Sequence, residues 1–402
     1  MKLFALSTSL PYPLTDGGKI RVFNLLRQLA RTHSVRLAAL ETEPTDRDSI
    51  QPLKEAGIDA RLIPLGDPNP PSLTPVSAAR SLLRGMPLAV SKYQLKPMRR
   101  ALAEELAEPF DLLLFEMMHT APYLPSARRL SNAPALLSTQ NVDSEVWDRA
   151  AERQKSRLRR AAYRWQANVF RRTERRLCPK FDALAAVSKR DADALRQHAP
   201  NALAAAIDNG VDLDAYRPSF DKERPATFVY TGSYDWEPNA DAAAYFCADI
   251  WPRIRAALPN AQFRAVGKRP TAAMLALHGQ NGIVVTGRVD DIQEHIAQAS
   301  VFAVPLRMGG GTRLKILEAM AMEKAVVSTT IGAEGLEMKN GRDLELADDP
   351  GAFADAAVRL ATDANARRAL GSAARKRVEE RYGWEAIGAK MRAFCERVAG
   401  QV

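Results

Sequence analysis

The chain of 402 residues is longer than one hydrophobic core usually organises, so its length favours two domains. Its 46% hydrophobic and 26% charged residues are typical of a globular protein and exclude a largely disordered chain. No apolar run approaches the roughly 20 residues of a membrane-spanning helix, and residues 3–6 are too short a run for the apolar region of a signal peptide. The three cysteines, Cys178, Cys247 and Cys395, are far apart, which argues against a disulfide framework or a zinc site and fits a reducing cytoplasm.

The net charge of +10 is concentrated in one stretch, residues 149–180, whose first and last members are Arg149 and Lys180. This stretch holds twelve basic and two acidic residues, so the rest of the chain is balanced in charge. The basic residues flank an apolar stripe at near-helical spacing. Such a helix either packs its stripe on a domain core or lies on an anionic bilayer. The stripe consists of Leu158, Ala161, Ala162, Trp165, Val169 and Leu177.

Short apolar runs alternate with longer stretches of helical period, which predicts an α/β fold with parallel sheets covered by helices. The first series of strands is expected at residues 2–7, 35–40, 60–65, 111–116, 135–139 and 183–187. The second series is expected at residues 227–231, 262–266, 283–286, 301–304 and 325–328. Two doubly wound, Rossmann-like domains facing a central cleft follow from this order.

The domain boundaries are expected in a polar stretch that contains Pro218 and Pro225. We assign residues 1–208 to an N-terminal domain on the acceptor side, 209–225 to a linker and 226–383 to a C-terminal, nucleotide-binding domain. Helices are expected at residues 350–361 and 365–381. The last segment, residues 384–402, is expected to pack back on the first domain.

Loops that follow strands are the places to search for chemistry, because helix N-termini there present free amides to anions. After the first strand, Gly17 and Gly18 precede a helical pattern that continues to Ala30. These glycines permit a close approach of the backbone to a phosphate or a sugar. A plain helix start with glycines is the alternative.

A second glycine-rich loop follows the strand expected at residues 301–304. Glycines leave the first amides of the next helix open to a diphosphate, and Arg313 and Lys315 on its first turns add positive charge. Glu318, further along the helix, is placed to accept hydrogen bonds from ribose hydroxyls. The alternative is a glycine-capped helix with solvated charges. The candidate binding residues of this loop are Arg307, Gly309, Gly310, Gly311, Thr312, Arg313, Lys315 and Glu318.

The run of residues 309–321, with residues 326–328 and 332–336 after it, resembles the nucleotide-sugar site of family 4 glycosyltransferases. Residues 209–212, 230–239 and 287–291 resemble that family's interdomain signature, the loop that opens its C-terminal domain and its base-side loop. Residues 17–21 and 139–147 are similar to N-terminal segments of the same group. The resemblance covers nearly the whole chain and adds Ser233, Arg288 and Val289 to the candidate binding residues.

This resemblance implies the two-domain GT-B fold and a retaining sugar transfer that needs no metal and no cofactor. The donor is expected to be a nucleoside-diphosphate sugar, with UDP favoured over GDP or ADP. The acceptor is expected to be a glycan, a lipid-linked sugar or a small molecule, in the synthesis of cell-surface polysaccharide or glycoconjugates. The alternatives are a nucleotide-sugar epimerase of the same architecture and a basic nucleic-acid-binding protein; no recognisable reading module accompanies the basic stretch, which argues against nucleic acid.

Two positions depart from the family pattern. Many members carry two glutamates eight positions apart, and Glu318 matches the second, whereas Gly310 occupies the place of the first. Many members also carry an arginine and a lysine in the loop that here spans residues 233–239, and this loop has neither. Neutralisation of the diphosphate therefore falls on Arg313, Lys315 and Arg307, and the donor sugar does not follow from the resemblance.

Glu116 and His119 are the candidate catalytic residues, because they follow the strand at residues 111–116 and are expected to face the cleft. A polar group near the sugar steers the charge separation that accompanies cleavage of the anomeric bond. A structural, hydrogen-bonding histidine is the alternative for His119. We expect a cytoplasmic protein, with peripheral attachment to the cytoplasmic face of a membrane through the basic stretch as an option.

Overall fold

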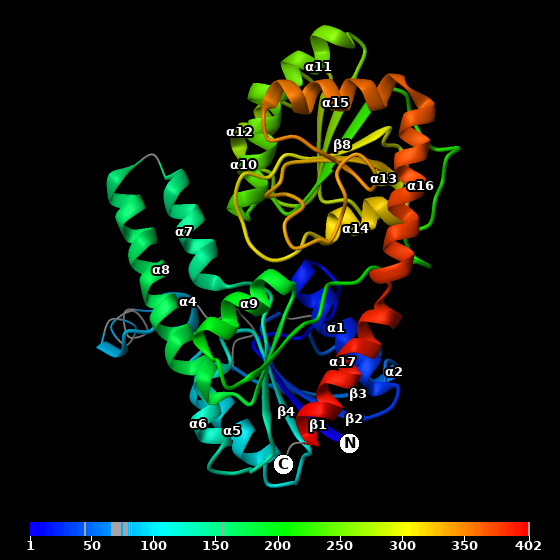
Figure 1. Ribbon diagram of the computed structural model, residues 1–402. Coiled ribbons are helices and arrows are strands. Elements are labelled where there is room, and N and C mark those ends of the chain that lie inside the picture. The colour runs from blue at the N-terminus through cyan, green and yellow to red at the C-terminus, as the bar shows by residue number, and fades with distance from the viewer. Residues whose placement is uncertain are drawn as a thin grey trace. The chain divides into compact units, whose positions relative to one another are not determined.

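The computed structural model describes residues 1–43, 46–65, 74, 79, 81, 83–154 and 156–400, and the chain forms two compact units (Figure 1). Unit 1 comprises residues 1–209 and 384–402, and unit 2 comprises residues 210–383. Lys155 of the basic stretch and residues 401–402 of the C-terminal segment lie outside the described residues.

Unit 1 is built on a seven-stranded parallel sheet with the order β3-β2-β1-β4-β5-β6-β7. Strands β4 and β5 are buried along their whole length, as expected for a parallel sheet covered on both faces. The strands are β1 (Lys2–Ser7), β2 (Ser34–Leu40), β3 (Ile58–Ile63), β4 (Leu112–Glu116), β5 (Ala135–Ser138), β6 (Ala183–Ala186) and β7 (Leu203–Ala206).

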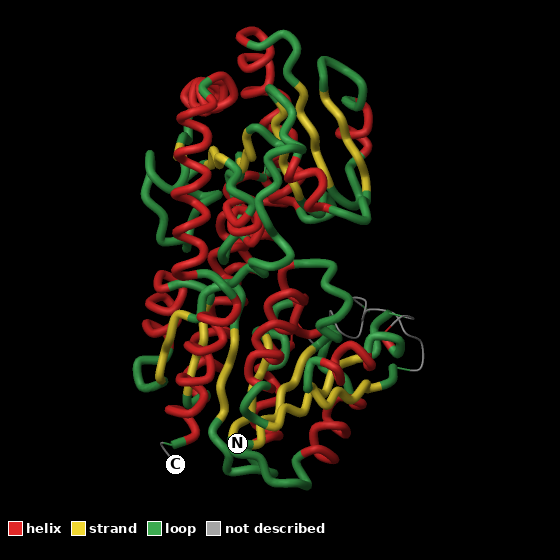
Figure 2. The backbone as a smooth tube through the Cα atoms, turned by 90° about the vertical axis from the view of Figure 1, so that its right-hand side faces the viewer, coloured by secondary structure: helices red, strands yellow, loops and turns green. Residues whose placement is uncertain are grey.

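The helices of unit 1 cover both faces of this sheet, as the tube view shows (Figure 2). The C-terminal helix α17 (Trp384–Ala399) packs against α1 (Gly17–Ala30), and Gly388 allows this close approach because a Cβ atom there would lie 2.4 Å from the Cβ of Gln28. The other helices are α2 (Ile50–Glu55), α4 (Leu88–Ser91), α5 (Lys96–Glu105), η2 (Ala121–Tyr123), α6 (Leu124–Ala127), α7 (Asp143–Arg153), α8 (Arg157–Leu177), η3 (Cys178–Lys180) and α9 (Lys189–His198).

Unit 2 is built on a six-stranded parallel sheet with the order β10-β9-β8-β11-β12-β13. Its strands are β8 (Thr227–Thr231), β9 (Gln262–Val266), β10 (Ile283–Gly287), β11 (Val301–Val304), β12 (Ala325–Ser328) and β13 (Glu345–Leu346). Its helices are α10 (Glu237–Tyr245), η4 (Phe246–Ile250), α11 (Trp251–Ala257), α12 (Ala272–Ala276), α13 (Ile292–Ala297), α14 (Leu314–Ala321), α15 (Pro350–Thr362) and α16 (Ala364–Arg381).

The order of the strands agrees with two doubly wound halves, and every expected strand is present. The third strand begins and ends two residues earlier than expected, at Ile58 and Ile63. Two edge strands were missed: β7 has the sequence Leu-Ala-Ala-Ala, which lacks the β-branched residues typical of strands, and β13 has only two residues. Residues 210–216 belong to unit 2 rather than to an independent linker, because Val211 pairs with Gly383 and Tyr216 packs on the core of that unit.

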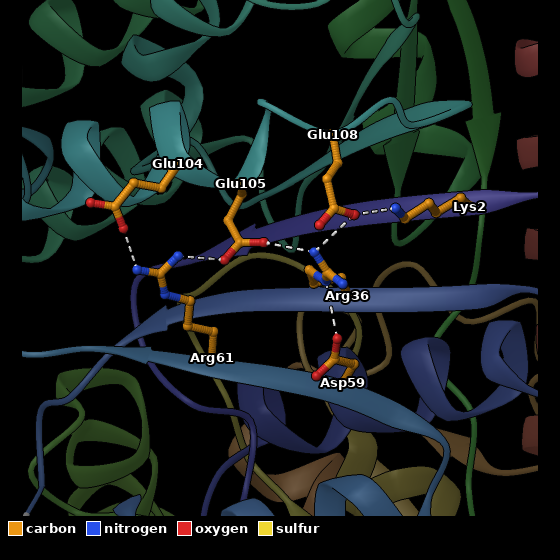
Figure 3. A network of polar contacts seen from close by, with 7 residues as sticks. All are labelled: Lys2, Arg36, Asp59, Arg61, Glu104, Glu105 and Glu108. Carbon is orange, nitrogen blue, oxygen red and sulfur yellow. Dashed lines mark hydrogen bonds and ion pairs between the residues drawn. The ribbon is translucent and has the colours of Figure 1, made fainter.

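A network of charged residues fixes helix α5 to the first three strands of unit 1 (Figure 3). Glu105 is 5% exposed and lies between two guanidinium groups, 2.7 Å from Arg61 Nη1 and 3.4 Å from Arg36 Nη1. Arg36 also donates to Asp59 at 3.0 Å, and Lys2 contacts Glu108 at 2.5 Å. Each charge therefore has an oppositely charged neighbour, which offsets the desolvation of Glu105.

Among the described residues, every helix is too short or too polar to cross a membrane.

Candidate functional site

Helix α14 begins where the strand order of unit 2 changes direction. Strands β8 and β11 are neighbours in the sheet although they are far apart in sequence, and the loops that follow them, residues 232–239 and 305–313, leave the same edge of the sheet (Figure 1). Ligands of open α/β sheets bind at this position. The glycine-rich loop predicted as a binding site therefore lies where the topology of unit 2 favours one.

Lys315, in the first turn of α14, connects this helix to β8 and to the start of α10. Its ammonium group lies 2.9 Å from Asn239 Oδ1 and 3.1 Å from the Tyr230 hydroxyl, and 4.2 Å from the centre of the Tyr230 ring. Burial lowers the pKa of Lys315 to about 7, with a further contribution from the positive charge of Arg313, while Glu318 opposes the change. The loop at residues 233–239, which lacks its own cation, thus receives one from α14.

Arg313 is the residue before α14 and not part of its first turn, because its backbone is extended. Its guanidinium turns back on the glycine-rich loop, where Nη1 donates to the carbonyl oxygens of Gly310 and Gly311. Gly309 and Gly311 have φ angles of 121° and 67°, which favour glycine. Thr312 is 9% exposed.

Arg307 points toward helix α10 instead of the glycine-rich loop. Its guanidinium forms two hydrogen bonds to Asp241, at 2.6 and 3.0 Å, and lies 4.3 Å from the centre of the Tyr245 ring. The Asp241 carboxylate raises the pKa of Arg307. This arrangement weakens the case for Arg307 as a phosphate ligand and gives it a role in joining β11 to α10.

Glu318 is half-buried, and its carboxylate interacts with the hydroxyl of Tyr216. Burial raises the pKa of Glu318, whereas the interaction with Tyr216 and the charge of Lys315 lower it. Burial and the Glu318 carboxylate together raise the pKa of Tyr216, so its hydroxyl remains a donor at neutral pH.

The negative charge of Asp291, in the loop after β10, also raises the pKa of Tyr216. Arg288 in this loop is exposed, and Val289 packs partly against the core of unit 2.

The loop after β8 is held in a compact shape. Ser233 donates through its hydroxyl to Asp235 at 2.5 Å, and its carbonyl oxygen accepts from the Asn239 side chain at 2.9 Å. Gly267 packs directly against Gly232: a Cβ atom on Gly267 would lie 1.8 Å from the Gly232 carbonyl oxygen. A side chain at position 267 would displace this loop.

In unit 1 the corresponding change of strand order lies between β1 and β4. The N-terminus of α1 is capped by Asp16, whose carboxylate accepts from the Lys19 amide at 3.0 Å. A Cβ atom on Gly18 would lie 3.1 Å from Met117 Cε and 3.2 Å from Gln140 Oε1. Met117 has a φ angle of 65°, a strained conformation of the kind that gathers at functional sites. Gly17 and Gly18 thus lie beside the ends of β4 and β5.

Glu116 lies inside unit 1 with 1% of its surface exposed, whereas the sequence predicted that its side chain faces the cleft. Burial raises its pKa to about 7, and the charge of Arg21 partly opposes this. Arg21 is fully buried and donates to Asn209 Oδ1 at 2.9 Å and to the Asp208 carbonyl oxygen at 3.0 Å. Burial lowers the pKa of Arg21 to about 10, opposed by the charges of Glu116 and Asp208. Glu116 therefore interacts with the buried guanidinium of Arg21, and its carboxyl group has little access to a substrate.

His119 is the more accessible of the two candidate catalytic residues. It is half-buried, and its ring lies edge-on to the ring of Tyr93, with centroids 5.2 Å apart. Burial lowers the pKa of His119 to about 4, and the positive charge of Lys92 acts in the same direction. The imidazole is consequently neutral at physiological pH.

The partners of the predicted residues were missed by sequence reasoning. The partners of Glu318, Lys315 and Glu116 are Tyr216, Asn239 and Arg21. Each partner is distant in sequence from the residue with which it interacts, and the spacing of hydrophobic residues does not predict these interactions. The motif at residues 230–239 contains Tyr230 and Asn239, so the resemblance offered a hint of their proximity to the site. Within the described part of the chain, histidine, cysteine and acidic side chains form no group of three that could hold a metal ion.

Two family models match most of the sequence. The "Glycosyl transferase 4-like domain" matches residues 16–210, and the "Glycosyl transferases group 1" model matches residues 225–363. The chain belongs to the family 4-like glycosyltransferases. The resemblance found in the loops is thereby confirmed at the level of the family.

Two curated relatives extend this result. A protein of Klebsiella pneumoniae described as an "Uncharacterized 44.6 kDa protein in cps region" is 22% identical over 95% of this chain and 96% of its own length. A GDP-mannose-dependent monoacylated alpha-(1-6)-phosphatidylinositol monomannoside mannosyltransferase of Corynebacterium glutamicum is 27% identical over 46% of this chain and 54% of its own length.

Solved structures show the fold. Sucrose-phosphate synthase from Thermosynechococcus elongatus matches over the whole of both chains with a TM-score of 0.74 and 18% identity. HepE from Anabaena, in complex with UDP, matches with a TM-score of 0.70 and 13% identity over 99% of this chain and 100% of its own. HepE in complex with UDP-glucose matches with a TM-score of 0.69 at the same identity and coverage. This glycosyltransferase therefore has the GT-B fold, with two Rossmann-like domains.

Proposed function

We propose that this glycosyltransferase transfers a sugar from a UDP-sugar, with retention of the anomeric configuration and without a metal ion. The acceptor is a glycan, a lipid-linked sugar or a small molecule, in the synthesis of cell-surface polysaccharide or glycoconjugate. The observation that carries the proposal is the position of the Lys315 ammonium, which reaches from α14 to Tyr230 of β8 and to Asn239 at the start of α10.

Lys315, Arg313 and the loop glycines would hold the diphosphate of the donor. The α14 N-terminus faces the same loop, and its amides favour negative charge. Glu318, oriented by Tyr216, would accept hydrogen bonds from the ribose hydroxyls. The loop with Arg288 and Val289 would lie beside the base. Each part of the nucleotide thus has a group of matching chemistry within unit 2.

In the proposed reaction, the bond from the anomeric carbon to the diphosphate oxygen breaks while the acceptor oxygen forms a bond to that carbon on the same face, which retains the configuration. The acceptor proton passes to the leaving diphosphate. Negative charge grows on the diphosphate as the bond breaks, so cations near it stabilise the transition state more than the ground state. Lys315 and Arg313 would supply that charge in the absence of a metal.

Support for UDP comes from HepE, which has the same fold and was solved with UDP and with UDP-glucose. The name of the Corynebacterium relative points instead to GDP-mannose, so GDP-sugars are the second candidate donors. Support for a role in cell-surface polysaccharide comes from the Klebsiella relative, whose description places it in a cps region.

Isothermal titration of the full chain with UDP-glucose, UDP-N-acetylglucosamine and GDP-mannose, in buffer containing a chelator, tests the donor. We expect UDP-sugars to bind and GDP-mannose to bind at least tenfold more weakly. Binding of GDP-mannose alone would overturn the choice of UDP, and dependence on added magnesium would overturn the metal-free reaction. Interconversion of UDP-sugars without an acceptor would favour an epimerase.

A further inference from the structure

Helix α8 divides into a buried half and an exposed half. Val169 and Leu177, in its C-terminal part, are buried against unit 1. Leu158 and Trp165, in its N-terminal part, are 85% and 40% exposed, and Ala161 and Ala162 between them are exposed as well. The apolar stripe read from the sequence therefore packs on the core only along part of the helix.

Helices α7 and α8 form an antiparallel pair that extends beyond the sheet of unit 1 (Figure 1). Trp147 of α7 contacts Tyr163 of α8, with ring centroids 5.1 Å apart, so α7 covers one side of the exposed half. At 100° per residue, Leu158, Ala161 and Trp165 lie on the side of α8 away from Tyr163. Their exposure leaves this apolar side of the helix in solvent.

Arginines surround the exposed apolar residues. Arg157, Arg164, Arg172, Arg175 and Arg176 are exposed, and none of them forms an ion pair with a described residue. Arg171, on the side toward α7, differs because it is paired with Asp148. We define the outer face of α8 by the residues that share this exposed side: Arg157, Leu158, Ala161, Ala162, Arg164, Trp165, Arg172, Arg175 and Arg176.

We propose that the outer face of α8 docks on the surface of an anionic lipid bilayer. Helices that lie in a membrane interface carry apolar side chains, often with tryptophan, on one side and lysine or arginine around them. Arginines at the surface are attracted by anionic headgroups, and the two apolar side chains enter the boundary with the acyl chains. Leu158 and Trp165 supply the apolar part, and the five arginines supply the charge.

Two other occupants fit the outer face less well. A nucleic acid would pair with the arginines but would leave Leu158 without an apolar partner. A second copy of this chain would bring its own arginines against those of the first, which is unfavourable in the absence of acidic partners on the same face. The bilayer matches both the charge and the apolar side chains. This inference does not depend on the identity of the donor.

Co-sedimentation of the full chain with vesicles tests the proposal. One set of vesicles contains phosphatidylcholine alone and the other contains phosphatidylcholine with 30% phosphatidylglycerol. We expect at least tenfold stronger partitioning to the anionic vesicles at 50 mM salt, and loss of most of this preference at 500 mM salt. Equal partitioning to both kinds of vesicle would overturn the proposal.

Matched variants locate the surface. Arg157→Glu, Arg164→Glu and Arg172→Glu combined should reduce binding to anionic vesicles at least tenfold. Lys96→Glu, Arg99→Glu and Arg129→Glu combined change the charge of unit 1 equally at other exposed positions and should reduce it less than threefold. Equal losses from the two triple variants would show that net charge alone acts, and would contradict a docking face on α8.

The apolar contribution is tested separately. Leu158→Ser with Trp165→Ser should weaken binding to anionic vesicles several-fold at unchanged charge, whereas Leu130→Ser, at another exposed leucine, should not. Circular dichroism and the melting temperature verify that each variant folds. Unchanged vesicle binding by the double variant, together with tighter binding of the wild type to a DNA duplex than to vesicles, would identify a nucleic-acid surface instead.

Discussion

The Tyr216 hydroxyl and the Glu318 carboxylate interact, since Tyr216 lowers the pKa of Glu318 and Glu318 raises the pKa of Tyr216, and this interaction links the segment that enters unit 2 to helix α14. The two residues are far apart in sequence, and neither belongs to the glycine-rich loop. Glu318 is partly exposed, so its carboxylate can accept hydrogen bonds from further donors. Ribose hydroxyls are the donors that the proposed function supplies.

Glu318→Ala should weaken binding of UDP-glucose by about 1.5 to 3 kcal/mol, because the variant loses charge-assisted hydrogen bonds to the ribose. Tyr216→Phe should weaken it by about 0.5 to 1.5 kcal/mol, because the carboxylate remains but loses its orienting donor. Titration calorimetry with UDP-glucose and with uridine measures both effects. A large fall in melting temperature with normal donor affinity in the remaining folded protein would make Glu318 a purely structural residue.

Lys315→Ala and Arg313→Ala should lose more affinity for UDP than for uridine, since both side chains are proposed to face the diphosphate. Arg307→Ala is the internal comparison, because Arg307 is bound to Asp241 and should affect the melting temperature more than the affinity for UDP. Calorimetric titration of each variant with the two ligands separates these cases. Equal losses for UDP and uridine would move Lys315 and Arg313 away from the phosphates.

The affinity for UDP-glucose should decrease as pH rises above 7. Lys315 has a pKa of about 7 in the free protein, and a nearby diphosphate favours its charged form, so the complex holds a proton that the free protein loses. Affinity should fall by up to about tenfold per pH unit above 7, until the pKa of the complex is reached. Titrations between pH 6 and 9 measure this slope, and Lys315→Ala should remove it. A slope retained by that variant would assign the proton to another group.

Glu116→Gln should make unit 1 more stable than the wild type at pH 8, and this gain over the wild type should be smaller at pH 5. The pKa of Glu116 is raised to about 7 in the folded state, so the folded protein binds a proton that the unfolded protein loses above about pH 4.3. The wild type therefore loses this contribution to stability as pH rises from 5 to 7, and the variant does not. We expect a difference of about 1 to 3 kcal/mol in the free energy of unfolding between the two pH values. Urea denaturation of both proteins measures it, and a difference independent of pH would contradict the buried, protonated carboxyl.

His119→Ala should lower turnover more than donor affinity, because a group that acts as charge develops affects the rate more than ground-state binding. The low pKa of His119, about 4, keeps its imidazole neutral. The wild type and the variant should therefore show the same dependence of turnover on pH near 6.5. Steady-state rates from pH 5.5 to 8.5 provide the measurement. Wild-type turnover in His119→Ala would remove this residue from the mechanism.

The sequence was sufficient to predict the two parallel sheets and the position of the glycine-rich loop, since buried parallel strands produce continuous apolar runs and glycines mark the turn that follows. Strand β7 was missed because its alanines lie partly exposed at the edge of the sheet and have no distinctive strand pattern. The predicted strands and the glycine-rich loop are recognised from the residue pattern within a single segment, and β7 has no such pattern.

The directions of side chains were harder to predict. Arg307 and Lys315 are both basic residues near the glycine-rich loop, yet Arg307 turns to Asp241 and Lys315 reaches Asn239. Glu116 ends a strand, and its position in the alternation of side chains points it into the interior beside Arg21. These outcomes depend on residues distant in sequence, so spacing along the chain contains no information about them.

Hydrogen exchange of the full chain with and without UDP, followed by mass spectrometry of its peptides, tests whether the loops around α14 bind a nucleoside diphosphate. We expect slower exchange in residues 231–239 and 307–318 on addition of UDP, and no such protection in Lys315→Ala at the same UDP concentration. Saturating UDP that protects other peptides and leaves both of these loops unchanged would contradict this binding.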